Sequence, residues 1–269
     1  MSSPNIYPAA FAPSGPDLLT LAGNYLSGSV LWVDSSSSVA SDSNAGTEPE
    51  LPKLTWTSAY AAASAGDTIL CAAGHAETIS SANTLNTANV TTIGLGLGTS
   101  RARFTSAVSA AAMWTPNVAG LTFMGCYFPA STATTTARIS IASGGTDCLV
   151  RGCFFDCGVN DTTSSLTIAG ARAYVRDVDF SVSASRPARG INLSGAVASC
   201  VFEDVSFDGG SFGWSQAAFN ITAAATLIRL ENIRLMNRSD FVATTTGTSY
   251  RGFGVRSMDT TGSRIVIAS

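Results

Sequence analysis

The feature of this sequence that most restricts its fold is a pattern that returns every 25–28 residues. Five segments align without gaps: LTFMGCYF (121–128), CLVRGCFF (148–155), AYVRDVDF (173–180), CVFEDVSF (200–207) and IRLENIRL (228–235). In each segment the first, third, sixth and eighth positions are apolar. A repeat of this length indicates stacked units, because one unit alone has nothing against which to bury its apolar side chains.

Alternating apolar positions predict two short strands in each segment. The fifth position between them is always of a type that tolerates a left-handed bend: Gly125, Gly152, Asp177, Asp204 and Asn232. A third strand is expected further along each repeat, in RISIA (138–142), SLTIA (165–169), GINLS (190–194) and AFNIT (218–222). The fold class that follows is all-β, a parallel solenoid with three strands per coil.

Equivalent positions in successive coils should stack about 4.8 Å apart. One inward column is expected to be an aromatic ladder of Phe128, Phe155, Phe180, Phe207 and Leu235. The cysteines of these coils fall into inward columns too, Cys126 with Cys153 and Cys148 with Cys200. We interpret them as buried apolar side chains. The sole histidine is His75, and no zinc-type spacing occurs, so neither a metal nor another cofactor is expected.

The N-terminal part of the chain carries a second signature. A strand-like LWVD precedes a loop with Asp42, Asn44, Gly46, Thr47 and Pro52, then a short Ala-rich helix with Thr55 or Thr57 as its cap, then Gly66, Asp67, Thr68 and Ile69. This order resembles the first segment of pectin-lyase-like right-handed parallel β-helices. The resemblance implies a right-handed solenoid closed by a capping helix. It implies little about function, because this segment serves enzymes and non-enzymes alike.

Two regions follow from these patterns. Residues 1–29 hold four of the nine prolines and show no periodicity, so we expect an extended N-terminal arm. Residues 30–269 should form the β-helix, with the capping segment and its helix at 30–80 and a final strand in SRIVIAS.

The composition of the chain argues against several classes of partner. Charged residues make up 12% of the chain, the net charge is −3 and no basic run occurs, which argues against a nucleic-acid partner. No apolar run reaches the length of a membrane span, so no membrane partner is expected. The first residues have neither a basic nor an apolar region of the kind found in signal peptides. The chain is therefore expected to assemble in a cytoplasm that keeps its thiols reduced.

Outward positions in the coils suggest an interface. Leu149, Tyr174 and Val201 should lie on successive coils, and Tyr127 and Phe154 should form a second pair. Contiguous apolar side chains on a surface usually mark an interaction site. We predict a subunit interface there, joined by Ile6, Tyr7 and Phe11 of the arm.

Carboxylates offer a catalytic alternative. The candidates are Asp156, Asp179 and Asp208 on the outside of the coils, with Asp161 and Glu203 nearby in sequence. A glycoside hydrolase on a β-helix needs two or three carboxylates converging on one face. By resemblance, a lyase of the pectate type uses clustered Asp for calcium and an Arg or Lys as base.

The leading hypothesis from sequence alone is a non-enzymatic structural protein of a phage virion. A small β-helix with an arm resembles capsid decoration, or cement, proteins. The resemblance implies a homotrimer that binds the major capsid protein, stabilises the shell and resides in the virion. The alternative is a carbohydrate-active β-helix, either a tailspike-type depolymerase or a polysaccharide lyase. A third reading is a sugar-binding module without turnover that uses Tyr127, Phe154 and Tyr174.

Overall fold

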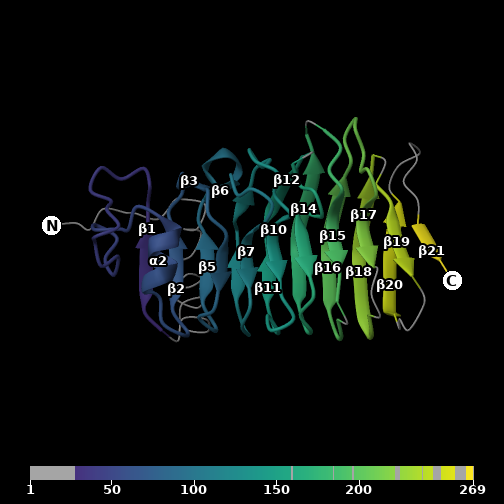
Figure 1. Cartoon of the computed structure of the whole chain (residues 1–269), viewed down its shortest axis with the longest axis horizontal. Coiled ribbons are helices and arrows are strands. Elements are labelled where there is room, and N and C mark those ends of the chain that lie inside the picture. The colour runs from purple at the N-terminus through teal and green to yellow at the C-terminus, as the bar shows by residue number, and fades with distance from the viewer. Residues whose placement is uncertain are drawn as a thin grey trace.

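Short strands joined by bends make up the coils, and the coils stack along one axis from the N-terminal to the C-terminal end (Figure 1). The structure is a computed structural model, and it describes residues 28–158, 160–183, 185–195, 197–221, 225–237, 239–244, 250–257 and 265–268. All strand pairs given for these residues are parallel. The predicted right-handed parallel β-helix is confirmed.

The strands form three faces. The first face contains β1 (Val30–Val33), β2 (Thr68–Cys71), β5 (Thr91–Gly94), β8 (Thr122–Met124) and β11 (Leu149–Arg151). The second face contains β3 (Ala76–Ile79), β6 (Arg103–Ser106), β9 (Tyr127–Phe128) and β12 (Phe154–Cys157). The longer strands β14 (Tyr174–Val182), β16 (Val201–Asp208), β18 (Ile228–Met236) and β20 (Tyr250–Ser257) run through both faces and join them into one 13-stranded sheet.

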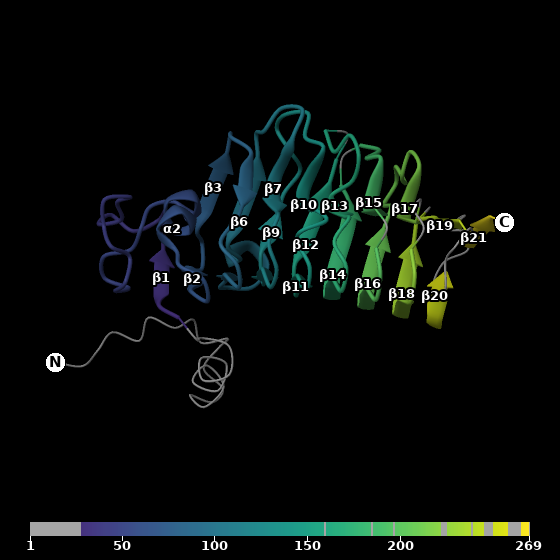
Figure 2. The ribbon, with the colours of Figure 1, turned by 60° about the horizontal axis from the view of Figure 1, so that its bottom comes forward.

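A separate eight-stranded sheet forms the third face. Its strands are β4 (Asn83–Leu85), β7 (Ala112–Pro116), β10 (Ala137–Ile141), β13 (Leu166–Ile168), β15 (Arg189–Leu193), β17 (Ala217–Ile221), β19 (Phe241–Thr244) and β21 (Ile265–Ala268). In Figure 2 this sheet runs beside the other two faces from β7 to β21. The four segments predicted as third strands and the final strand are all found here.

The predicted bends lie between the first and second faces. Gly125, Gly152, Asp177, Asp204 and Asn232 all have a positive φ, between 50° and 66°. From the third of these coils onward, the strand runs on through the bend, although the bend residues themselves are not paired. Each predicted pair of short strands is then a single long strand, such as β14.

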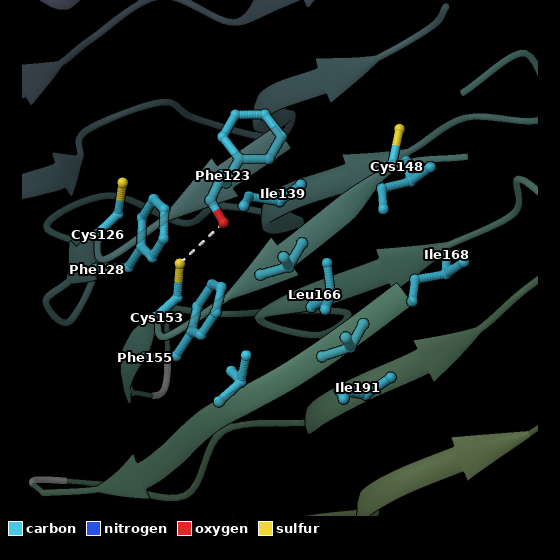
Figure 3. Packing of buried hydrophobic residues seen from close by; sticks show 14 of the residues in the cluster. Phe123, Cys126, Phe128, Ile139, Cys148, Cys153, Phe155, Leu166, Ile168 and Ile191 are labelled. Carbon is cyan, nitrogen blue, oxygen red and sulfur yellow. Dashed lines mark hydrogen bonds between the residues drawn. The ribbon is translucent and has the colours of Figure 1, made fainter. Parts of the chain in front are cut away.

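The core fills the space between the faces. Phe128, Phe155, Phe180 and Phe207 stack with ring centroids 4.6–5.0 Å apart, which confirms the aromatic ladder. Phe104 extends this ladder one coil further, with its centroid 6.2 Å from Phe128. In Figure 3 the thiols of Cys126 and Cys153 lie beside this column. All six cysteines are buried and free, as expected for side chains used only in packing.

A short helix, α2 (Trp56–Ala62), covers the first coil. Thr55 caps the helix by accepting a hydrogen bond from the Ser58 amide, as the sequence suggested. Trp56 is fully buried and lies 4.2 Å from Trp114 between ring centroids. The helix therefore seals the core where no earlier coil stacks on it. Within the described part of the chain, no helix has the length and apolar character to cross a membrane.

Candidate functional site

The outward side chains of the second face form two rows that run across the coils. Strand register places Arg103, Tyr127, Phe154, Asp179, Ser206 and Arg234 in what we call the first row. The second row, one pleat further along the strands, contains Asp156, Ser181, Asp208 and Met236. Asp156, Asp179 and Asp208 thus share one face, as predicted. Asp156 and Asp179 lie next to Phe154 of the predicted aromatic pair, whereas Asp208 lies two coils further along.

A pocket of about 320 Å³ opens on the first row. Its lining residues are Gly98, Thr99, Arg101, Tyr127 and Phe154. The two aromatic rings lie 5.4 Å apart at an angle of 58°. The opposite wall is η2 (Gly98–Ser100), a short 3₁₀ turn between β5 and β6.

Glycine is required where this wall turns back toward the sheet. Gly96 has a φ of +90°, and a Cβ atom there would lie 2.2 Å from the Ser100 carbonyl oxygen. Any side chain at this position would force the backbone of this wall to move. The Gly-rich LGLGTS stretch therefore shapes the pocket.

Tyr127 lies between charges of both signs. Partial burial is the main cause that raises the pKa of its phenol, and the nearby Asp156 carboxylate raises it further. The guanidinium groups of Arg103 and Arg138 act in the opposite direction and lower it. Because its pKa lies above the ordinary value of 10.0, the Tyr127 hydroxyl is protonated at neutral pH and can donate a hydrogen bond.

The three candidate carboxylates differ in their hydrogen-bond partners. Asp156 accepts a 2.5 Å hydrogen bond from the Ser183 hydroxyl, and Asp179 accepts one from the Ser206 hydroxyl. Asp208 instead accepts from the Gly210 amide at 2.9 Å within its own turn and from an Asn237 side-chain nitrogen of the following coil at 2.7 Å. We assign Asp208 to turn stabilisation. Asp156 and Asp179 remain the candidates beside the pocket.

Asp161, which the sequence grouped with the outward carboxylates, is wrong as a surface candidate. Its side chain is fully buried and forms an ion pair with the equally buried Arg138. Glu203 lies on the first face, where it accepts a hydrogen bond from the Tyr174 hydroxyl. Neither carboxylate faces the pocket.

The predicted interface residues lie where the pattern put them. Leu149, Tyr174 and Val201 occupy one outward row of the first face in register. Each of these side chains is half-buried within its own chain. Whether a second subunit covers them stays a prediction. Ile6, Tyr7 and Phe11 lie outside the described residues.

Arg101 and Arg103 were missed by the sequence analysis. The alignment of repeats began at residue 121, one coil after these arginines. Extending it backward would have aligned Phe104 with Phe128, and hence Arg103 with Tyr127. Within the described residues, no cluster of three or more His, Cys, Asp or Glu side chains is arranged to hold a metal ion.

No family model matches the chain, and no curated protein matches its sequence. Among solved structures it is similar to pectate lyase Pel9A, with 11% identity and a TM-score of 0.49 over 90% of this chain and 76% of that one. It is also similar to the PL6 family alginate lyase AlyGC, with 12% identity and a TM-score of 0.41 over 90% of this chain and 40% of that one.

Both of these proteins are lyases by name, and the expectation that this protein is not an enzyme is corrected on that finding. Identities this low speak only to the fold, so no substrate or catalytic residue is carried over from either protein. Neither structure bears on a virion, and a virion location, a trimer and a capsid partner stay predictions from sequence. By its coils, its strand register and its capping helix, the chain is a right-handed parallel β-helix whose capped first segment resembles that of pectin-lyase-like proteins.

Proposed function

We propose that this β-helix binds an acidic polysaccharide on its second face and cleaves it there. The observation that carries the proposal is the pocket of Tyr127, Phe154 and Arg101, bordered by the outward Asp156 and Asp179. It combines apolar rings, a cation and carboxylates on a rigid sheet, the groups that a charged sugar chain requires.

Binding would use the aromatic pair and the arginines. Aromatic rings offer broad apolar surface with an edge that accepts polar neighbours, and they suit the C–H face of a sugar ring. Arg101 lines the pocket, and Arg103 is next to Tyr127 in the first row. A guanidinium group pairs with a carboxylate through two parallel hydrogen bonds, which favours a uronic acid over a neutral sugar.

Cleavage is assigned as β-elimination. An arginine that neutralises the sugar carboxylate makes the adjacent C–H more acidic, and Asp156 takes that proton. The electron pair forms a C=C bond as the C–O bond to the leaving sugar breaks. The Tyr127 hydroxyl donates its proton to the leaving oxygen. Asp156, which lies close enough to influence the Tyr127 pKa, then returns a proton to the phenolate.

Hydrolysis is the competing reaction at the same site. Asp156 and Asp179 are diagonal neighbours on adjacent coils, which places their Cα atoms roughly 8 Å apart from strand geometry. An inverting hydrolase needs its two carboxyl groups roughly 6.5–9.5 Å apart, a separation that side chains on these two Cα atoms can reach. The product separates the two reactions, because only elimination leaves a double bond that absorbs in the ultraviolet.

The experiment incubates the purified protein with polygalacturonate, alginate, hyaluronan and a neutral glucan. We expect ultraviolet absorbance and new reducing ends with at least one acidic polymer. Tyr127→Phe and Asp156→Asn should each lower kcat by about 100-fold or more, as expected for an acid and a base.

Asp177→Asn is the matched control. It removes a carboxylate at a bend, where the equivalent residue of a later coil is Asn232. We expect full activity from this variant. Reducing ends without ultraviolet absorbance would replace elimination by hydrolysis, and no cleavage of any acidic polymer would overturn the proposal.

A further inference from the structure

A buried ion pair lies directly behind the candidate site. Arg138, at the start of β10, and Asp161, in the loop after β12, both have side chains with 0% exposure. An Nη1 atom of Arg138 donates to Oδ2 of Asp161. Removing two charges from water is costly unless their remaining polar atoms also find partners, so the other contacts of this pair decide what it does.

The second Nη atom of Arg138 joins two neighbouring coils. It donates to the Pro129 carbonyl at 2.7 Å and to the Asp156 carbonyl at 3.0 Å. Pro129 directly follows β9, the strand that carries Tyr127, and Asp156 belongs to β12, the strand that also carries Phe154. One guanidinium group therefore fixes the backbone beside the proposed acid and at the proposed base.

Asp161 ties the same group to the surrounding loops. Its carboxylate accepts hydrogen bonds from the Ser131 hydroxyl at 3.2 Å, the Ser165 hydroxyl at 3.0 Å and the Gly158 amide at 3.4 Å. The carboxylate thus holds the turns that leave β9 and β12. It also holds the guanidinium in the orientation that reaches the two carbonyls.

We propose that Arg138 and Asp161 are positioning residues for the site on the second face. They hold β9 and β12 at the separation that aligns Tyr127 with Asp156. The inference rests on the proposed function. Because both side chains are fully buried, they act through the strands and do not touch the substrate.

The first test needs no turnover. Hydrogen exchange is followed by mass spectrometry in the wild type, Arg138→Met and Lys53→Met. Lys53 is the matched control, a buried cation that donates to the Asn44 and Asp42 carbonyls in the capping segment. We expect Arg138→Met to exchange faster in residues 127–136 and 154–158, and Lys53→Met to do so only around residues 42–58. Unchanged exchange behind the site, or equal loosening of every coil, would overturn the inference.

The second test measures kinetics on the acidic polymer that the wild type cleaves. We expect Arg138→Met to lower kcat by about 100-fold with KM within about threefold, since small misplacements of reacting groups cost rate more than binding. Arg138→Lys keeps the positive charge, but its single ammonium group has to replace a guanidinium that reaches both the Pro129 and the Asp156 carbonyls. This variant should therefore have a kcat between those of Arg138→Met and the wild type. Asp161→Asn should lower kcat in the same direction, and Lys53→Met should leave it unchanged.

The two proposals fail in different ways. A wild-type protein without turnover defeats the proposed function, while the exchange pattern still decides whether this pair holds the two strands. A wild-type protein with turnover, together with an Arg138→Met variant of normal kcat, defeats the positioning role alone. An equal loss of kcat in Lys53→Met would do the same, because general destabilisation would then explain both variants.

Discussion

A single backbone conformation recurs where each coil passes from its first to its second face. Gly125 and Gly152 hold it in two coils, and Asp177, Asp204 and Asn232 hold it in the next three. In the left-handed region a Cβ atom approaches the following carbonyl oxygen, which costs roughly 1–2 kcal/mol for most residues. Asp and Asn tolerate it better than most residues because their side chains are short and polar. Here the bend residues also pair between coils, since an Asn232 side-chain nitrogen donates to Asp204 of the preceding coil at 2.5 Å.

Two glycines at this bend allow a matched comparison. A Cβ atom on Gly152 would have no neighbour nearer than 3.8 Å, whereas on Gly125 it would lie 2.4 Å from the Gly94 carbonyl oxygen. We expect Gly152→Ala to lower the free energy of unfolding by about 1 kcal/mol through backbone strain alone. Gly125→Ala should cost at least about 2 kcal/mol more, as measured by urea unfolding. Equal losses would show that the contact with Gly94 relaxes freely.

Cys148 makes stability depend on alkaline pH. Burial is the main cause that raises the pKa of its thiol from 9.0 to about 11. Below pH 9 the thiol is neutral in both states; between pH 9 and 11 the unfolded chain loses the proton first, so folding becomes less favourable. The wild type should lose on the order of 2 kcal/mol over this range relative to Cys148→Ala. The replacement fits because Ala173 occupies the next position of the same column. Parallel pH curves for the two proteins would contradict this.

At the scale of the elements, the aromatic ladder carries much of the core. Each ring contacts the ring of the coil before and the coil after, and Leu235 ends the series. The ladder therefore links neighbouring coils through side chains as well as through strand hydrogen bonds.

Phe180 tests the ladder from its middle, between Phe155 at 4.8 Å and Phe207 at 5.0 Å. Phe180→Ala should lower the free energy of unfolding by about 3–5 kcal/mol, since it leaves a cavity that stacked strands have little freedom to close. Phe180→Leu should cost about 1–2 kcal/mol, because Leu235 shows that the column accepts leucine. Thermal or urea unfolding measures both. Equal losses for the two variants would place the cost in lost ring stacking instead of lost volume.

Secondary-structure elements could be predicted where every coil needs apolar side chains at the same inward positions. The alternation of apolar residues in 148–155 and 200–207 indicates which side chains face the core. Because the pattern recurs, it also predicts the strands, the bend between them and the register between coils. The pocket wall at 98–100 and the loop carrying Asp161 occur once each, so no repetition marks them. The buried pair was invisible for the same reason: Arg138 lies near the start of a strand and Asp161 in a loop, and only the fold brings them together.

At the scale of the whole molecule, the first face carries ion pairs beside the predicted subunit interface. On the first face, Arg176 lies 3.7 Å from Glu203, and Arg229 lies 2.6 Å from Glu231, beside the row of Leu149, Tyr174 and Val201. These exposed ion pairs contribute little stability, but they frame the apolar row.

Self-association is the prediction that belongs to this row. If three chains meet there, light scattering behind a sizing column should give three times the 27.5 kDa mass of one chain. Val201→Asp should return the mass to that of a single chain, because it places a charge in the buried row. Ser140→Asp on the third face is the control and should not. A wild-type protein that stays at 27.5 kDa at every concentration would contradict the predicted trimer.

The alternation of inward and outward side chains affects how the sequence of such a protein can evolve. Packing in the core restricts which residues can occupy the inward positions. The outward Tyr127, Phe154 and Asp179 are restricted only by what binds to the second face. Substitutions in the outward rows therefore leave the packing of the coils almost untouched. Selection can rewrite the recognition surface while the scaffold persists, and a designer can exchange outward residues coil by coil on the same backbone.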